Sequence, residues 1–500
     1  MSKSSKSRNT VRHSPPVLPA GWWTPLALFG IVLAFALIRG AGMFNDLWLD
    51  EIWSIRMMQS ISAPWEILTK VQHDNNHPLN ALFIYLISPV EADWMYRMFS
   101  WVTGSVTVGL AAMVATRLYQ RLQPDENRLQ PALAGLFSAP IIGGAYLLIH
   151  YSSEARGYAP AVAFALLAFY ALLRASENNW GKWAALYGAA CVLGLLSHLA
   201  VVQVMLAAVG WTLVTSVNER DTWRNRITRA LGWHLVPWLF FVAYYFGFVR
   251  HLEIGEGPQN SLGEVLRQVA VYSLGFPASW GGVALVVGAA MIFGSLFLVG
   301  RKSGALATFF VLVIAVTPLL GLGFSRFSLL FPRYFIISVV FALIAVGFGV
   351  TRLWLRAWGW QIVVATALAL FLLGNGLHVS HLWHEGRGQY RAALREIAAR
   401  TPSDDISIGS DHDFRNFALV DYYRNVVGPR HRVIYVSADK ILPGGVQWLL
   451  LHRLDGQPAP AASVTDVLGN RYVQEGVYPH APLSGWDWYV YRNVLLRPRR

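Results

Sequence analysis

The sequence predicts an α-helical protein that crosses a membrane many times and ends in a small soluble α/β domain. Hydrophobic residues make up 55% of the 500 residues and charged residues only 14%, which leaves too little polar surface for a soluble chain of this length. Apolar runs recur along the chain, and each is long enough to cross about 30 Å of hydrocarbon as a helix. Lipid is therefore expected to be the main solvent.

The predicted membrane domain covers residues 22–378, behind a basic tail at residues 1–21. The first helix is expected at residues 22–41 and, because no small-residue cleavage site follows it, we treat it as retained. Further helices are expected near residues 94–116, 131–150, 157–173, 183–197, 199–217, 231–249, 280–300, 304–323, 334–350 and 358–377, about eleven in all. The apolar stretch at residues 79–90 has about twelve residues, too few to span the bilayer, and is predicted to lie in the interface.

Basic residues determine the predicted orientation. The net charge is +13, and Lys and Arg gather in every second connection, within residues 117–128, 174–182, 220–229, 301–302 and 352–356. This alternation is the positive-inside pattern, so these connections and the basic tail are expected in the cytoplasm. With an odd number of helices the C-terminus then lies outside. The same scattering argues against a single basic face for nucleic acid.

The composition changes to that of a soluble domain near residue 379, and we expect an extracytoplasmic α/β domain at residues 379–500. Residues 386–400 indicate an amphipathic helix, 404–410 a strand, and 411–424 a second helix with an acidic start. The segments RVIYV, VQWLLLHR and DWYVYRN alternate as further strands do.

The external segment at residues 42–93 carries the acidic pair Asp50 and Glu51 between tryptophans. Adjacent acids on a helix point about 100° apart, so one can face a reaction site while the other orients a partner or a substrate hydroxyl. The alternative is that the pair complements the dipole at the start of a short helix.

The same segment contains HDNNHPLN, which brings His73, Asp74 and His77 within five residues. Such a set could bind a divalent metal or a phosphate. A polar turn ahead of an interfacial helix explains the pattern equally well.

Later external turns hold further charged residues. Glu154 and Arg156 stand at the outer mouth of an apolar helix, where charges are costly without a role or a partner in another loop. His198 at the next outer turn is a site candidate or a structural residue. Arg326 and Arg333 lie on the external side, against the positive-inside trend, and fit either an anionic lipid head group or interfacial snorkelling.

Taken in order, these motifs resemble the GT-C superfamily of membrane glycosyltransferases, in particular protein O-mannosyltransferases (glycosyltransferase family 39) and the aminoarabinose transferase of lipid A modification. The resemblance covers roughly residues 20 to 400 and rests on Asp50-Glu51, on D-x-x-H-P at Asp74, His77 and Pro78, on E-A-R-x-Y at Glu154, Arg156 and Tyr158, on His198, and on Pro332-Arg333-Tyr334. The chain departs from the family pattern at Leu79, where a second proline is common, and at Ser153, where glutamine is usual. Neither departure removes a reacting group.

The resemblance implies a GT-C fold and a sugar donor linked through phosphate to a polyprenol, with transfer on the non-cytoplasmic face. It implies that Asp50 is the general base for the acceptor hydroxyl and that Glu51 assists in positioning the acceptor. Stabilisation of the leaving polyprenyl phosphate falls to Arg333 with Arg156 or Arg326. The remaining donor or substrate contacts are expected from Tyr334, Glu154, His77 and Asp74.

The expected activity is that of an inverting hexosyl or pentosyl transferase that requires no cofactor; a divalent metal at His77 and His198 stays an open alternative. Its partners would be the bilayer, the donor lipid, and a lipid, glycan or protein acceptor. The sequence contains no Asn-x-Ser/Thr sequon, which favours a bacterial inner membrane. The rival hypothesis is a transporter or flippase of lipid-linked sugars, which would place key polar residues near the bilayer midplane.

Overall fold

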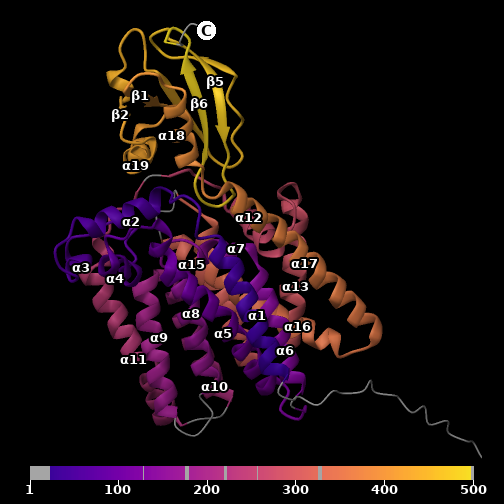
Figure 1. Ribbon diagram of the computed structural model, residues 1–500. Helices are drawn as coiled ribbons and strands as arrows, with labels where there is room; N and C mark the ends of the chain where they lie inside the picture. Colours follow the sequence, from indigo (N-terminus) through magenta and orange to yellow (C-terminus); the bar gives the residue numbers. More distant parts are fainter. Residues whose placement is uncertain are drawn as a thin grey trace, which may run out of the picture.

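A computed structural model describes residues 23–127, 129–174, 180–218, 222–255, 257–324 and 329–496. Long helices stand side by side as a bundle, and an α/β domain sits on one end of it (Figure 1). Helix α1 (Trp23–Ala41) begins at the opposite end of the bundle from that domain.

Every predicted membrane segment is helical in the structure. The bundle contains α1, α5 (Met98–Leu122), α6 (Leu129–Gly144), α7 (Tyr146–Ser152), α8 (Tyr158–Leu173), α9 (Trp180–Ser197), α10 (Val202–Asn218), α11 (Trp223–Gly247), α13 (Gly281–Gly300), α14 (Gly304–Val311), α15 (Thr317–Phe324), α16 (Ile336–Trp354) and α17 (Trp358–Glu385). Within the described residues, eight helices are long and apolar enough to cross a membrane, and α6 with α7 makes a ninth if the bent pair is one span. Helices α8 and α9, also predicted to cross, fall outside that group; α8 has only 16 residues and is largely buried among its neighbours.

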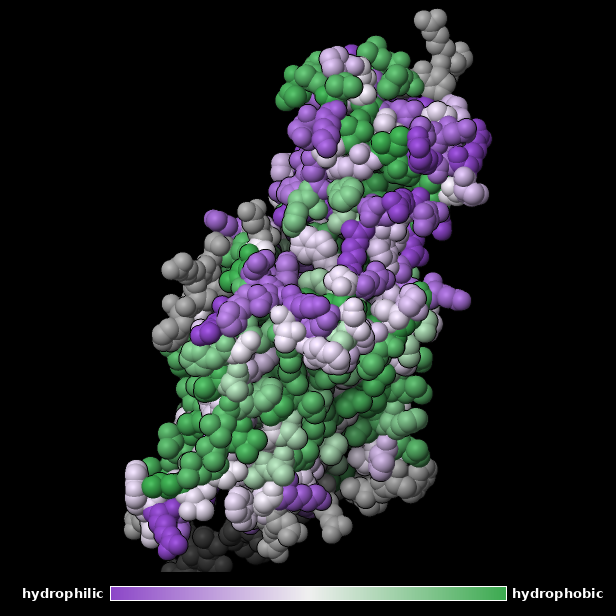
Figure 2. Space-filling model, turned by 90° about the vertical axis from the view of Figure 1, so that its left-hand side faces the viewer, coloured by the Kyte–Doolittle hydropathy of each residue, from purple (hydrophilic) through white to green (hydrophobic). Residues whose placement is uncertain are grey.

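The outer face of the bundle is apolar. Figure 2 shows a hydrophobic band across the helices on the face in view, with hydrophilic residues at the far end and a mixture of hydrophilic and hydrophobic residues on the α/β domain. Large apolar side chains point outward from the surface helices: Phe293 of α13 is 72% exposed and Leu373 of α17 is 64% exposed. Helix α16 is buried along almost its whole length and forms the centre of the bundle. This distribution suits a lipid solvent.

The predicted helix at residues 131–150 is broken, because α6 and α7 meet at 65°. The break leaves carbonyl groups of α6 and an N–H of α7 without helical partners. The guanidinium of Arg39 donates to the carbonyl oxygens of Gly143 (2.9 Å) and Ile142 (3.4 Å), and the amide N–H of Tyr146 donates to Oδ1 of Asn375 (2.7 Å). Side chains from α1 and α17 therefore satisfy the backbone at the break.

The segment between α1 and α5 folds against the end of the bundle as short helices: α2 (Leu49–Gln59), α3 (Glu66–Thr69), α4 (Pro78–Ile87) and the 3₁₀ helix η1 (Asp93–Arg97). Helix α4 has 10 residues, about 15 Å of helix, so it cannot span the bilayer, as the sequence predicts. A further short helix, α12 (Leu262–Leu274), follows α11 and was not predicted from the sequence.

The C-terminal domain is a six-stranded sheet with two helices. Its elements are α18 (Tyr390–Ala399), β1 (Asp405–Ser410), α19 (Asp413–Tyr423), β2 (Arg432–Tyr435), β3 (Trp448–Arg453), β4 (Ser463–Thr465), β5 (Arg471–Tyr478) and β6 (Asp487–Asn493). The strand order is β2-β1-β3-β6-β5-β4, with β1 parallel to β2 and β3 and the other pairs antiparallel. The predicted helices and strands of this domain are confirmed, whereas β4 and β5 were not predicted.

Helix α17 runs to Glu385, past its predicted end at 377, because a helix that leaves the apolar layer can continue with polar residues.

The C-terminal domain shares an apolar core with the segment between α1 and α5, apart from the main core of the bundle. Trp48 and Ile52 at α2 belong to the same buried cluster as Leu394 of α18 and Trp488 of β6. Helix α19 packs on α2, where Arg56 pairs with Asp421 at 2.6 Å. This packing positions the C-terminal domain directly over the segment that carries Asp50.

Candidate active site between the bundle and the C-terminal domain

Asp50 lies in the first turn of α2, between two guanidinium groups. Its carboxylate is hydrogen-bonded to Arg156, and Nη1 of Arg333 lies 3.7 Å from its Oδ2. The carbonyl oxygen of Asp50 accepts a hydrogen bond from Asn75 Nδ2 (2.5 Å). The three charged side chains are between 4% and 16% exposed. The structure thus brings together three predicted residues that come from separate external segments.

This group contains more positive charge and more donors than the protein uses. Two guanidinium groups face one carboxylate, and Nε of Arg156, Nε of Arg333 and Nε1 of Trp48 are buried without a hydrogen-bond partner among the described residues. The guanidinium of Arg156 lies 5.9 Å from the centre of the Trp48 ring. Buried donors are rarely left unpaired, so the arrangement fits an anion.

Two histidines complete the wall around Arg156. The rings of His77 and His198 stack at 5.2 Å, and Nη2 of Arg156 donates to Nε2 of His77 (3.2 Å) and to the hydroxyl of Tyr158 (3.2 Å). Burial, then the charge of Arg156, holds the pKa of His77 well below its usual value and lowers that of His198 to about 3. Both rings are neutral at physiological pH. Among the described residues they meet no third His, Cys, Asp or Glu in a group that could hold a metal.

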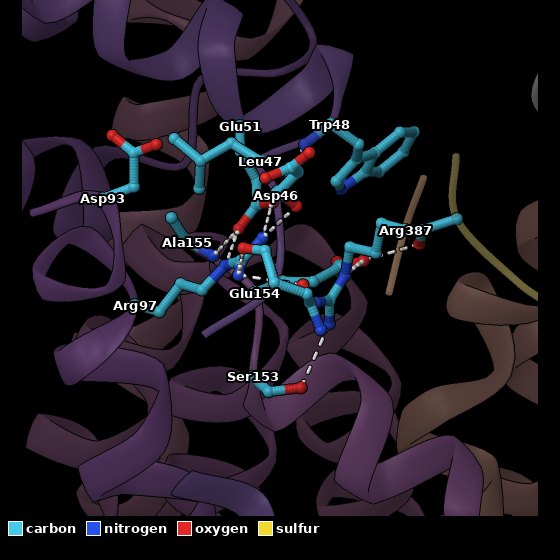
Figure 3. A network of polar contacts seen from close by, with 12 residues as sticks. Asp46, Leu47, Trp48, Glu51, Asp93, Arg97, Ser153, Glu154, Ala155 and Arg387 are labelled. Atoms are coloured by element: carbon cyan, nitrogen blue, oxygen red, sulfur yellow. Dashed lines mark hydrogen bonds and ion pairs between the residues drawn. The ribbon is translucent and has the colours of Figure 1, made fainter. Parts of the chain in front are cut away.

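Glu51 lies in a buried polar network with Arg97 and Ala155 (Figure 3). Its carboxylate is fully buried and pairs with Arg97 through bonds of 2.7 Å and 2.6 Å. It also accepts hydrogen bonds from the backbone N–H groups of Ala155 (2.7 Å) and Trp48 (3.3 Å). Glu51 therefore ties α2 to the start of α5 and to the segment that carries Arg156.

Glu154 is held by both domains. Its Oε1 accepts hydrogen bonds from Ser484 Oγ (2.5 Å) and Arg387 Nε (3.1 Å), and His150 Nε2 lies 3.2 Å away. Burial raises the pKa of Glu154, but the hydrogen bond of His150 and the charge of Arg387 outweigh burial and lower it. Arg387 also donates to Ser153 Oγ (3.0 Å), as Figure 3 shows. The carboxylate is charged and belongs to the contact between the domains.

Ser484 reaches Glu154 because the loop at residues 479–485, between β5 and β6, enters the bundle. The hydroxyl of Tyr146 donates to the carbonyl oxygen of Pro482 (3.0 Å). Gly485 packs so tightly that a Cβ there would lie 1.7 Å from the carbonyl oxygen of Arg387. Only glycine fits this approach.

The other predicted site residues lie around this centre. Asp74 is partly exposed, and its Oδ1 lies 3.0 Å from Nδ1 of His73. Burial raises the pKa of Asp74, but the hydrogen bond and charge of His73, and then the charge of Arg156, hold that pKa below its usual value. Tyr334 follows Arg333 in the 3₁₀ helix η6 (Pro332–Phe335), and its ring contacts Phe331. Arg326 lies outside the described residues.

Sequence reasoning missed Arg97, Arg387, Ser484 and Trp48. A charge at the start of an apolar helix is costly without a partner, and this signal could have pointed to Arg97. Ser484 carries no such signal, because an ordinary serine in a loop marks nothing.

The structure contains an apolar cavity of about 200 Å³, and one of the residues that line it is Phe335, two positions after Arg333 in the sequence. Phe335 and Ser338 line it at the start of α16, and Leu266, Leu285 and other side chains from α12 and α13 complete it. An apolar chain attached to an anion at Arg333 could extend into this cavity.

No protein-family model matches the chain, and no curated protein matches it either. Solved structures do. ArnT from Cupriavidus metallidurans bound to undecaprenyl phosphate superposes with a TM-score of 0.53 over 96% of this chain and 99% of that one, at 15% identity. The chain has the GT-C fold. The apo form of the same ArnT gives a TM-score of 0.51 over 95% and 100% of the two chains, also at 15% identity. The apo oligosaccharyltransferase of Archaeoglobus fulgidus gives 0.51 over 86% and 70%, at 10% identity. These superpositions establish the architecture, whereas identities of 10% to 15% leave the chemistry to be argued from the residues of the site.

Proposed function

We propose that this protein is a glycosyltransferase that moves a hexosyl or pentosyl group from a polyprenyl-phosphate donor to a hydroxyl acceptor, with Asp50 as general base. The observation that carries the proposal is the surplus of buried hydrogen-bond donors around one carboxylate: the guanidinium groups of Arg156 and Arg333 and the neutral indole N–H of Trp48. The proteins of like fold include one bound to undecaprenyl phosphate.

The donor's phosphate would bind between Arg156 and Arg333. A polyprenyl-phosphate sugar is a phosphodiester with one negative charge, and the leaving polyprenyl phosphate gains further charge as the bond to the sugar breaks. Two guanidinium groups bind the leaving group more strongly than the donor, and this difference lowers the barrier. The apolar cavity behind Phe335 would take the first part of the polyprenyl chain.

Asp50 would take the acceptor's proton. Before the donor binds, Arg156 is hydrogen-bonded to the Asp50 carboxylate; a phosphate competes for that guanidinium and leaves a carboxylate oxygen free. The acceptor oxygen then attacks the anomeric carbon, the bond from that carbon to the phosphate oxygen breaks, and the hydroxyl proton moves to Asp50. The sugar's configuration inverts.

In this proposal Glu51 holds neighbouring groups of the site in place and does not touch the substrates. Because its carboxylate is buried and fully bonded to protein groups, an acceptor has no access to it. Its bond to the Ala155 N–H fixes the residue next to Arg156. The reaction face would be the outer side of a bacterial inner membrane, where the C-terminal domain would cover the site.

The test is transfer from a radiolabelled polyprenyl-phosphate sugar to membrane acceptors, with release of free polyprenyl phosphate as the second readout. Asp50→Asn is expected to lower turnover by about 10²-fold or more. The matched control is Asp404→Asn, a change of an 81% exposed acid in the C-terminal domain, which should transfer normally. Near-normal transfer by a folded Asp50→Asn protein contradicts the role of Asp50. Movement of intact donor across vesicles without release of polyprenyl phosphate identifies a flippase instead.

A further inference from the structure

We propose a second anion site, on the C-terminal domain, in which Arg415 binds a phosphate or carboxylate group of the acceptor. This inference rests on the proposed function and deepens it, because it makes the acceptor a hydroxyl-bearing anion such as a phosphorylated or acidic glycan.

Arg415 is held in one orientation by its own domain. Its Nη1 donates to Nε2 of His452 (3.0 Å), and Nδ1 of His452 lies 2.9 Å from Oδ1 of Asp411. Since arginine can only donate, Nε2 of His452 is the acceptor, and the Nδ1–H of His452 donates a hydrogen bond to Asp411. The guanidinium also lies 5.8 Å from the centre of the Trp486 ring. The side chain is therefore preorganised.

The guanidinium of Arg415 lacks an acidic partner. Among the described residues no carboxylate lies within ion-pair distance of it, and Asp411, the acid in its network, is engaged by His452 and by Arg453 (3.0 Å). A guanidinium has five N–H donors, of which His452 takes one. Burial lowers the pKa of Arg415, against the charges of Asp411 and Asp50. Partial burial of an unpaired cation is costly, so an anionic ligand is the simplest reason to hold it there.

The position of Arg415 matches the proposed reaction. It lies on α19, which packs on α2, the helix of Asp50, and the charge of Asp50 acts on Arg415. Phe414, 57% exposed, contacts the Trp53 ring at 4.8 Å, and Trp53 contacts His73 at 5.5 Å. Aromatic faces suit the apolar face of a sugar ring. An acceptor held by its anion at Arg415 and by these rings would present a hydroxyl toward Asp50.

The experiment measures binding to the full-length protein in nanodiscs, with glucose 6-phosphate, glucuronate and glucose as probes. Wild type is expected to bind the two anions more tightly than glucose, and the stronger anion shows whether phosphate or carboxylate is preferred. Arg415→Gln should weaken binding of the preferred anion about tenfold or more, and Arg415→Lys should recover part of the loss. The matched control is Arg424→Gln, which removes an exposed arginine directly after the end of α19 and should bind as wild type does.

Equal binding of the anions and glucose by wild type overturns the proposal, as does unchanged anion binding by a folded Arg415→Gln protein. Loss of anion binding in Arg333→Gln but not in Arg415→Gln would assign the probes to the donor site and also overturns it. Release of polyprenyl phosphate from labelled donor is measured in parallel on wild type. Its absence refutes the proposed glycosyl transfer whatever the probes do, so the two failures are distinguishable.

Discussion

Replacement of Arg97 by alanine will destabilise the protein by about 3–5 kcal/mol, because it leaves the Glu51 carboxylate buried without a cation. Both side chains are 0% exposed, and bonds of 2.7 Å and 2.6 Å join them. The variant also removes the donor to the carbonyl oxygens of Met43 (2.7 Å) and Asn45 (2.8 Å). Unpaired buried acceptors add to the loss.

The matched control is Arg56→Ala. Arg56 pairs with Asp421 at 2.6 Å, but these side chains are 33% and 31% exposed, so the loss should be about 0–1 kcal/mol. Thermal unfolding in detergent, followed by tryptophan fluorescence, gives both midpoints under one set of conditions. The double variant Glu51→Gln/Arg97→Met should regain most of the stability, because it removes both buried charges.

Equal midpoints for Arg97→Ala and Arg56→Ala would refute this account of the buried pair. Transfer by the double variant decides the role of Glu51. Glycosyl transfer close to the wild-type rate agrees with a Glu51 that only holds neighbouring groups in place. A stable double variant without transfer would instead place Glu51 in the reaction itself.

Three further outcomes are expected. Gly157→Ala should lower the yield of folded protein, since its Cβ would lie 1.9 Å from the carbonyl oxygen of Ser197, whereas Gly376→Ala, with open space around it, should be tolerated. Ser484→Ala removes a 2.5 Å bond to the charged Glu154 and should cost about 1.5–3 kcal/mol in the same unfolding assay; an unchanged midpoint would contradict the importance of that bond. Burial lowers the pKa of His480, but hydrogen bonds to Asp455 and Asp487 raise it to about 9. Because the unfolded imidazole titrates near 6.5, the stability gained is complete below about pH 6.5 and is lost as pH rises toward 9; the excess fall in midpoint over that range should vanish in His480→Gln.

The membrane helices could be predicted because an apolar run of about twenty residues is itself the signal for a helix that crosses the bilayer. The break between α6 and α7 could not, since its partners, Arg39 and Asn375, lie far away in the sequence. Helix α12 escaped prediction because its 13 residues form neither a long apolar run nor a motif.

For the candidate site, the charge pattern predicted only that Asp50, Arg156 and Arg333 share the external face, and the family resemblance implied that they act together. The structure places the two guanidinium groups beside the Asp50 carboxylate. The partners of Glu51 and Glu154 were not foreseen. A buried carboxylate needs a cation from somewhere in the fold, and only the three-dimensional arrangement shows which of the chain's arginines supplies it.

Ser484 leaves the ribosome long after Glu154, which lies 330 residues earlier. During that interval the Glu154 carboxylate lacks its hydroxyl donor, although Glu51 can already bind the N–H of the neighbouring Ala155. A polypeptide that stops before the β5–β6 loop can insert its helices but carries an unfinished pocket. The site between the bundle and the C-terminal domain is therefore expected to reach its final form only when the last loop of the chain has folded.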